Sequence, residues 1–179
     1  MIRTFGALAV AMLACAAVHI QAGDNPTTAA EADSSGVAPL SVPEARRQAT
    51  LLHETYLATL LVVHREYFDE KNRVTLPARA FEDVFKSIDK RTGGHTRWIA
   101  VNTPAMNVDH EPKPGFEKDA AKALANGEKD FESVAGNVYQ RASGIPFAAS
   151  CSKCHQSALG SRRAGRMAGL VVSLPVQTP

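Results

Sequence analysis

The chain has 179 residues, of which 20 are Lys or Arg and 18 are Asp or Glu. This length is sufficient for one domain with its own hydrophobic core. The charges nearly balance and no block of basic residues occurs, which argues against a nucleic-acid-binding protein. The weakly basic composition does not by itself favour any other class of partner.

The N-terminal segment has the three parts of a secretory signal peptide. Arg3 supplies a positive charge, Phe5 to Val18 is apolar and uncharged, and Ile20-Gln21-Ala22 resembles a signal-peptidase site. The apolar run is too short for an ordinary membrane-spanning helix. We therefore predict a signal peptide over residues 1–22 and a periplasmic location for the mature chain.

The same segment allows two other outcomes. The signal could stay uncleaved as an anchor, or Cys15 could be lipidated, although Met12 makes the match to a lipoprotein signal imperfect. Either outcome would attach the chain to a membrane. Without them we expect no membrane contact.

The sequence after the signal divides into a linker and one domain. Residues 23–42 are rich in small, polar and acidic residues without an apolar period, which predicts a flexible linker. Ser41, with Glu44 three residues later, has the pattern of a capping box and predicts a helix start. We place the folded domain at residues 43–176.

Periodicity predicts an α+β fold for this domain. Apolar residues recur at helical spacing in a long first helix with one wide buried face, and in two shorter helices. These expected helices cover residues 43–68, 77–88 and 116–124. Segments rich in β-branched and aromatic residues predict strands. The expected strands cover residues 95–102, 130–134, 137–142 and 168–174.

The run Cys151-Ser152-Lys153-Cys154-His155 is the most specific motif in the chain. This pattern is typical of covalent attachment of a c-type haem. The two thiols would form thioethers with the two vinyl groups of one haem. His155 would then be the proximal ligand of the iron. We expect this motif to lie on a short helix before the last strand.

Two other interpretations of the motif are weaker. A structural zinc site needs further Cys or His ligands at close spacing, and neither follows His155. A thioredoxin-like dithiol usually opens a helix after a strand, and no such unit precedes Cys151. Cleavage at Ala22 would also remove Cys15, which leaves Cys151 and Cys154 as the only thiols.

The ligand on the opposite face of the iron is open at this stage. The candidate distal ligands are His64, His110 and Met106, with His95 and Met167 as weaker ones and an open or water-bound site as a further possibility. Two strand arginines, Arg97 and Arg141, could contact haem propionates, but we expect them to be solvated.

The order of these segments resembles a family of exported, single-haem c-type proteins with a PAS-like fold. The resemblance covers about residues 50–175, including Arg97-Trp98-Ile99-Ala100-Val101, the haem motif, and the closing run from Ala164 to Pro175. It implies a PAS-like antiparallel sheet and one covalent haem c. The loop at residues 107–112 departs from the more basic Arg-Asn-Pro loop of many members, so details of the distal pocket are not carried over.

These features predict an electron carrier that works with a redox partner protein. The alternatives are a module that senses redox state or a small diatomic ligand, and a dithiol oxidoreductase without haem. Enzymatic activity is uncertain, because no dedicated acid–base pair stands out beside the distal histidine candidates. The sequence thus leaves the role of the iron open while indicating how it would be held.

Overall fold

The computed structural model describes residues 37–67, 77–148, 151, 155 and 166–177. The predicted signal peptide at residues 1–22 lies outside this part, as do most of the predicted linker and most of the predicted haem-attachment helix. Within the described residues, no helix combines the length and the hydrophobicity needed to cross a bilayer.

Three α-helices form where the apolar periodicity predicts them. They are α1 (Val42–Tyr67), α2 (Pro77–Thr92) and α3 (Phe116–Ala125). The predicted capping box begins α1: the Glu44 carboxylate accepts hydrogen bonds from the Ser41 backbone N–H at 2.9 Å and from its hydroxyl at 2.6 Å. A 3₁₀ turn, η1 (Val108–His110), interrupts the predicted loop before α3 and is capped by the side chain of Asn107.

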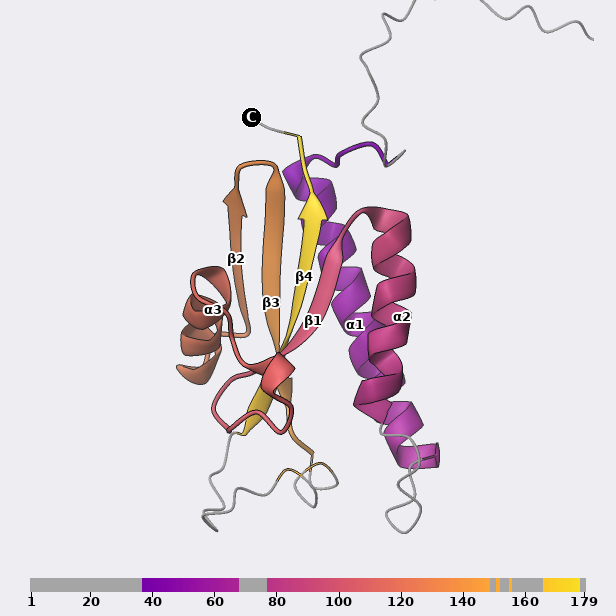
Figure 1. The fold of residues 1–179 in the computed structure, drawn as a ribbon, viewed down its shortest axis with the longest axis vertical. Coiled ribbons are helices and arrows are strands. Elements are labelled where there is room, and N and C mark those ends of the chain that lie inside the picture. Colours follow the sequence, from indigo (N-terminus) through magenta and orange to yellow (C-terminus); the bar gives the residue numbers. More distant parts are fainter. Residues whose placement is uncertain (1–36, 68–76, 149–150, 152–154, 156–165, 178–179) are drawn as a thin grey trace, which may run out of the picture. The chain divides into compact units, whose positions relative to one another are not determined.

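Four strands form one antiparallel sheet in the order β1-β4-β3-β2 (Figure 1). They are β1 (His95–Ala100), β2 (Asp130–Ala135), β3 (Val138–Pro146) and β4 (Met167–Pro175). The α+β fold with an antiparallel sheet and a long N-terminal helix is therefore confirmed. Since the last strand lies between β1 and β3, the segment that carries the haem motif connects two neighbouring central strands.

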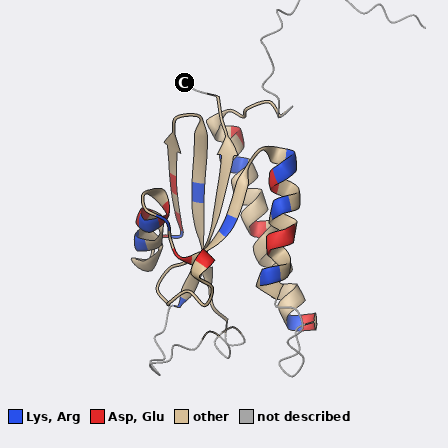
Figure 2. Ribbon diagram, viewed as in Figure 1, with Lys and Arg blue, Asp and Glu red and all other residues tan. Residues whose placement is uncertain are grey.

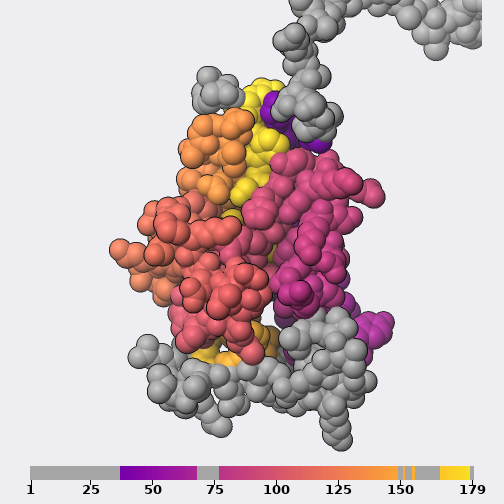
Figure 3. Space-filling model, viewed as in Figure 1, coloured from indigo at the N-terminus to yellow at the C-terminus, as the bar shows by residue number. Residues whose placement is uncertain are grey.

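Both faces of the sheet are covered by helices. Alternate residues of each strand point to opposite faces, so Trp98, Leu170 and Val172 pack against α1 and α2, whereas Ile99 and Val171 pack against α3. In Figure 1, α1 and α2 lie side by side and α3 lies beside β2. The space-filling view shows α2 and the segment from residue 101 through α3 as neighbouring parts of the surface (Figure 3).

The fully buried residues of α1 end at Tyr56, which differs from the single wide buried face that we predicted along the whole helix. The buried residues are Ala45, Ala49, His53 and Tyr56. Beyond them the apolar run continues, yet Leu61 is 41% exposed and Tyr67 is 80% exposed. The helix reaches past the part of the sheet that covers it, so periodicity alone overestimated its buried length.

The folded unit begins before residue 43. Leu40, which we assigned to the linker, donates its backbone N–H to Pro175 at 3.1 Å and accepts one from Gln177 at 2.9 Å. β3 also continues beyond its predicted end, because Gly144 lies directly opposite Gly169 of β4. Backbone pairing with β4 thus holds segments whose small or polar residues had suggested coil.

The two strand arginines are half-buried in ion pairs, so the prediction that they are solvated was wrong. Arg97 pairs with Glu117 of α3 at 2.6 Å, and Arg141 pairs with Asp130 at 2.7 Å and Glu132 at 3.3 Å. Figure 2 shows basic positions within the sheet as well as on the helices. The side chains of both arginines are less than 15% exposed.

Candidate functional site

A backbone hydrogen bond joins the two ends of the Cys-x-x-Cys-His motif. The backbone N–H of His155 donates to the carbonyl of Cys151 at 3.0 Å, which is the i to i−4 bond of an α-helix. The N–H of Cys151 in turn donates to Ala148 at 3.0 Å. Cys154 lies outside the described residues, so its placement stays a prediction.

The ends of β3 and β4 hold this turn in place. The N–H of Phe147 donates to the carbonyl of Arg166 at 3.0 Å, and the Arg166 guanidinium donates to the carbonyl of His155 at 2.9 Å. The rings of Phe147 and His155 have centroids 4.7 Å apart and are inclined by 44°. The imidazole of His155 is therefore fixed against an aromatic ring at one end of the sheet.

Two other histidines approach His155 from different elements. Although part of the residue is exposed, burial of the imidazole lowers the pKa of His155, and the charges of His64 and His110 lower it further. These residues come from the last turn of α1 and from η1. A lowered pKa keeps the imidazole of His155 neutral, which is the form that binds a metal.

His110 makes a direct contact with α2. Its Nε2 lies 3.0 Å from Oε1 of Glu82, and the two side chains are 25% and 23% exposed. Glu82 also lies 3.5 Å from Arg79, one turn earlier on the same helix. Nε2 of His110 is thus engaged by a carboxylate in this structure.

The loop that carries His110 is fixed from its other side by Arg97. The guanidinium donates to the backbone carbonyl of Asp109 and to that of Glu111 at 3.4 Å, while it pairs with Glu117. Glu117 also accepts the backbone N–H of Lys113 at 2.7 Å. A half-buried ion pair therefore ties β1, α3 and the loop around η1 together.

The remaining distal candidates are placed less favourably. Met106 is 69% exposed. The side chain of His95 is 64% exposed and lies 4.0 Å from Asp89. Met167 is half-buried, and its backbone N–H donates to the side chain of Asn102 at 2.9 Å.

The described residues fit a haem better than a bare metal ion. They include no group of three or more His, Cys, Asp or Glu side chains arranged to hold a metal. The set does offer a neutral imidazole, a thiol one helical turn away, and a second histidine beside incompletely buried apolar side chains of α1, such as Leu60 and Leu61. An apolar surface next to an imidazole is what one face of a porphyrin requires.

Three residues of this site were not found from the sequence in their present roles. They are Glu82, Phe147 and Arg166. None of the three belongs to the Cys-x-x-Cys-His motif. Their contacts lie outside any helical or strand period, so the sequence pattern does not reveal them.

A family model described as Tll0287-like matches residues 41–167, which include the first helix, the sheet up to β4 and the Cys-x-x-Cys-His motif. The chain belongs to the Tll0287-like family. A search of curated proteins found no match.

A solved member of similar fold is the cyanobacterial heme-protein Tll0287, known from a crystal structure. It superposes with a TM-score of 0.58 and 17% sequence identity, over 78% of this chain and 99% of that one. At this identity the likeness establishes a shared fold. The Tll0287-like fold thus spans nearly the whole of the described domain.

Proposed function

We propose that this member of the Tll0287-like family is a periplasmic protein with one covalently bound haem c that carries electrons to or from a redox partner. Cys151 and Cys154 would form the thioethers, and His155 would be the proximal ligand. Three observations support the proposal: the motif itself, the export signal, and a structural neighbour described as a heme-protein. The motif carries the proposal furthest, because a Cys-x-x-Cys-His run is typical of covalent haem attachment. The influence of the His64 and His110 charges on the pKa of His155 supports it.

We propose His64 as the distal ligand. After burial, its charge has the largest effect on the pKa of His155. His110 reaches the same region, but a carboxylate of α2 engages its Nε2. Met106 lies largely in solvent. His64 also lies next to Leu60 and Leu61, which could cover an apolar ring.

The residues of the chain have distinct tasks in this assignment. A bound haem would supply a one-electron Fe(III)/Fe(II) couple. Phe147 packs against the ring of His155, and the Arg166 guanidinium donates to the backbone carbonyl of His155. Hydrogen bonding and burial of this kind are the means by which a protein adjusts the potential of a haem.

Sensing is the second candidate function. Exposed apolar side chains at the end of α1 indicate a less tightly covered distal side, where a diatomic ligand could compete with His64.

A dithiol oxidoreductase without haem is a third candidate from another class. It would use Cys151 and Cys154 as a reversible redox pair.

An optical spectrum of the purified, reduced protein, with and without CO, distinguishes these functions. A low-spin spectrum that CO leaves unchanged is the expected result for a six-coordinate electron carrier. Ready CO binding would favour the sensor instead. A colourless protein whose two thiols oxidise and reduce reversibly would support the dithiol enzyme and contradict the haem proposal.

A further inference from the structure

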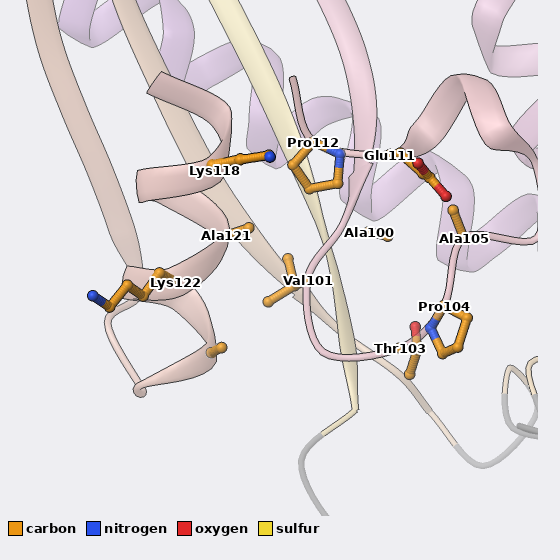
Figure 4. A pocket seen from close by; sticks show the side chains of 11 residues that line it. Ala100, Val101, Thr103, Pro104, Ala105, Glu111, Pro112, Lys118, Ala121 and Lys122 are labelled. Carbon is orange, nitrogen blue, oxygen red and sulfur yellow. The ribbon is translucent and has the colours of Figure 1, made fainter. Parts of the chain in front are cut away.

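A hollow of about 520 Å³ lies between α3 and the loop that follows β1 (Figure 4). Its lining is formed mainly by small apolar side chains, among them Ala100, Val101, Ala121 and Ala125. The volume lies within the range of small-molecule sites in proteins. The hollow is shallow and widely open to solvent, so it would bury only part of a ligand.

The charged side chains around this hollow carry opposite charges. The side chain of Lys118 extends across the hollow toward Pro112, while Glu111 lies on the far side (Figure 4). Lys122 also lines the hollow, but its amine points away from it. Neither lysine forms an ion pair with an acidic side chain in the described part of the chain, whereas Glu117 beside them is already paired with Arg97.

From this arrangement we infer that the hollow binds a small aliphatic monocarboxylate. Its hydrocarbon chain would lie on Val101 and Ala121, and its carboxylate would pair with the amine of Lys118. Glu111 would repel a second carboxylate, so a dicarboxylate is disfavoured. The inference does not depend on haem, because none of the lining residues belongs to the Cys-x-x-Cys-His motif.

The loop that lines the hollow also carries η1. Thr103, Pro104 and Ala105 form one wall, and Glu111 and Pro112 continue directly from His110. A ligand in the hollow would therefore contact the segment whose backbone carbonyls, at Asp109 and Glu111, accept hydrogen bonds from Arg97. Occupancy would restrain this loop, and through it the contact between His110 and Glu82.

Titration of the ¹⁵N-labelled full chain with hexanoate, followed by amide chemical shifts, tests the inference. We expect saturable shifts centred on residues 100–105, 111–112 and 118–125. The neutral analogue hexanamide and the dicarboxylate glutarate should bind at least about fivefold more weakly, since one lacks the charge and the other meets Glu111. Shifts that do not saturate, that lie elsewhere, or that are equal for hexanoate and hexanamide would overturn the inference.

Substitutions of single charged residues test which side chain pairs with the carboxylate of hexanoate. Lys118→Gln should weaken hexanoate binding about tenfold, and Glu111→Gln should strengthen it. Lys122→Gln removes the same charge from the same helix and should change binding less than about threefold. Equal losses for the two lysine variants, or tight binding of inorganic phosphate, would show a diffuse anion surface and contradict a built site. Capture of an acidic protein with no affinity for hexanoate would likewise refute it.

Discussion

Glu132 on β2 receives hydrogen bonds from side chains of two other elements. Nε of Arg46 on α1 donates at 2.9 Å, the hydroxyl of Tyr139 on β3 donates at 2.6 Å, and Arg141 donates at 3.3 Å. The bonds from Arg46, followed by that from Tyr139 and by the charges of both arginines, lower the pKa of Glu132 to about 2 against the opposing effect of burial. This network joins the first half of α1 to the edge of the sheet.

The lowered pKa makes Glu132 a source of pH-dependent stability. Because the folded-state pKa lies below the usual value of 4.5, the contribution is present above pH 4.5 and is lost as the pH falls toward 2. The side chain is 32% exposed, so solvent screening reduces the contribution to about 1–2 kcal/mol.

Glu132→Gln should therefore destabilise the protein by about 1–2 kcal/mol at pH 7 and by much less near pH 2. Urea unfolding of wild type and variant at both pH values measures the difference. The matched control is Glu128→Gln, at an exposed position without an ion pair among the described side chains. An equal loss of stability at the two pH values would contradict the assignment of this pH dependence to Glu132.

His64 and His110 differ in what they can offer an iron. His64→Ala should open the distal side, so that the reduced protein binds CO and shows a high-spin spectrum without it. His110→Ala should leave a six-coordinate spectrum, because the ring of His110 is engaged by Glu82. Absorption spectra of the two purified variants provide the comparison. A six-coordinate His64→Ala protein beside an open His110→Ala protein would reverse the assignment.

At the scale of the elements, the pairing of β3 with β4 brings two glycines opposite each other. Gly169 lies under the side chains of β1 and α3: a Cβ there would lie 2.8 Å from Cγ1 of Ile99 and 3.2 Å from Leu124. At Gly144 the nearest atom would be the sulfur of Met167 at 3.5 Å, an ordinary contact. An added methyl group would therefore clash with its neighbours at Gly169 but would fit at Gly144.

Gly169→Ala should cost about 1–3 kcal/mol, since Ile99 and Leu124 must shift within a packed core. Gly144→Ala, its cross-strand neighbour, is the matched control and should change stability by less than about 0.5 kcal/mol. Thermal unfolding of both variants measures the two effects. If the two substitutions are equally tolerated, α3 does not pack on β4 as closely as described.

Much of this arrangement of elements could be predicted from the sequence, and the failures have a physical pattern. The apolar period gave the three helices, and β-branched and aromatic residues gave β1 and β4. The segments that were missed, at Leu40 and from Ser143 to Pro146, pair with β4 or the residues directly after it. Pro39, Gly144 and Pro146 interrupt the strand pattern there. Sheet order likewise depends on contacts between distant residues, which no local pattern encodes.

The candidate site shows the same division. The motif at residues 151–155 and the distal candidates His64 and His110 follow from residue type and spacing alone. The contact of His110 with Glu82, which lies 28 residues away in sequence, could not be predicted from residue type and spacing. Similarly, Arg97 could be placed on a strand, but its ion pair with Glu117 joins elements whose packing the sequence does not specify.

At the scale of the whole molecule, the candidate haem-binding residues lie near one end of the sheet. The last turn of α1 carries His64, η1 carries His110, and His155 belongs to the segment between β3 and β4. The ends of these elements can be followed in Figure 1. The opposite end carries the hairpin between β2 and β3 and the start of α1. A Tll0287-like domain of this kind keeps a rigid, covered sheet as the support for a site built from connecting segments.

Acid-acetone extraction of the exported protein tests whether one haem is bound covalently at Cys151 and Cys154, as we propose. We predict that the Soret absorption stays with the polypeptide and that the mass of the intact chain is increased by one haem. In the Cys151→Ser, Cys154→Ser variant both signals should be lost. Haem that passes into the acetone from the wild-type protein, or a wild-type chain without haem, would contradict the account.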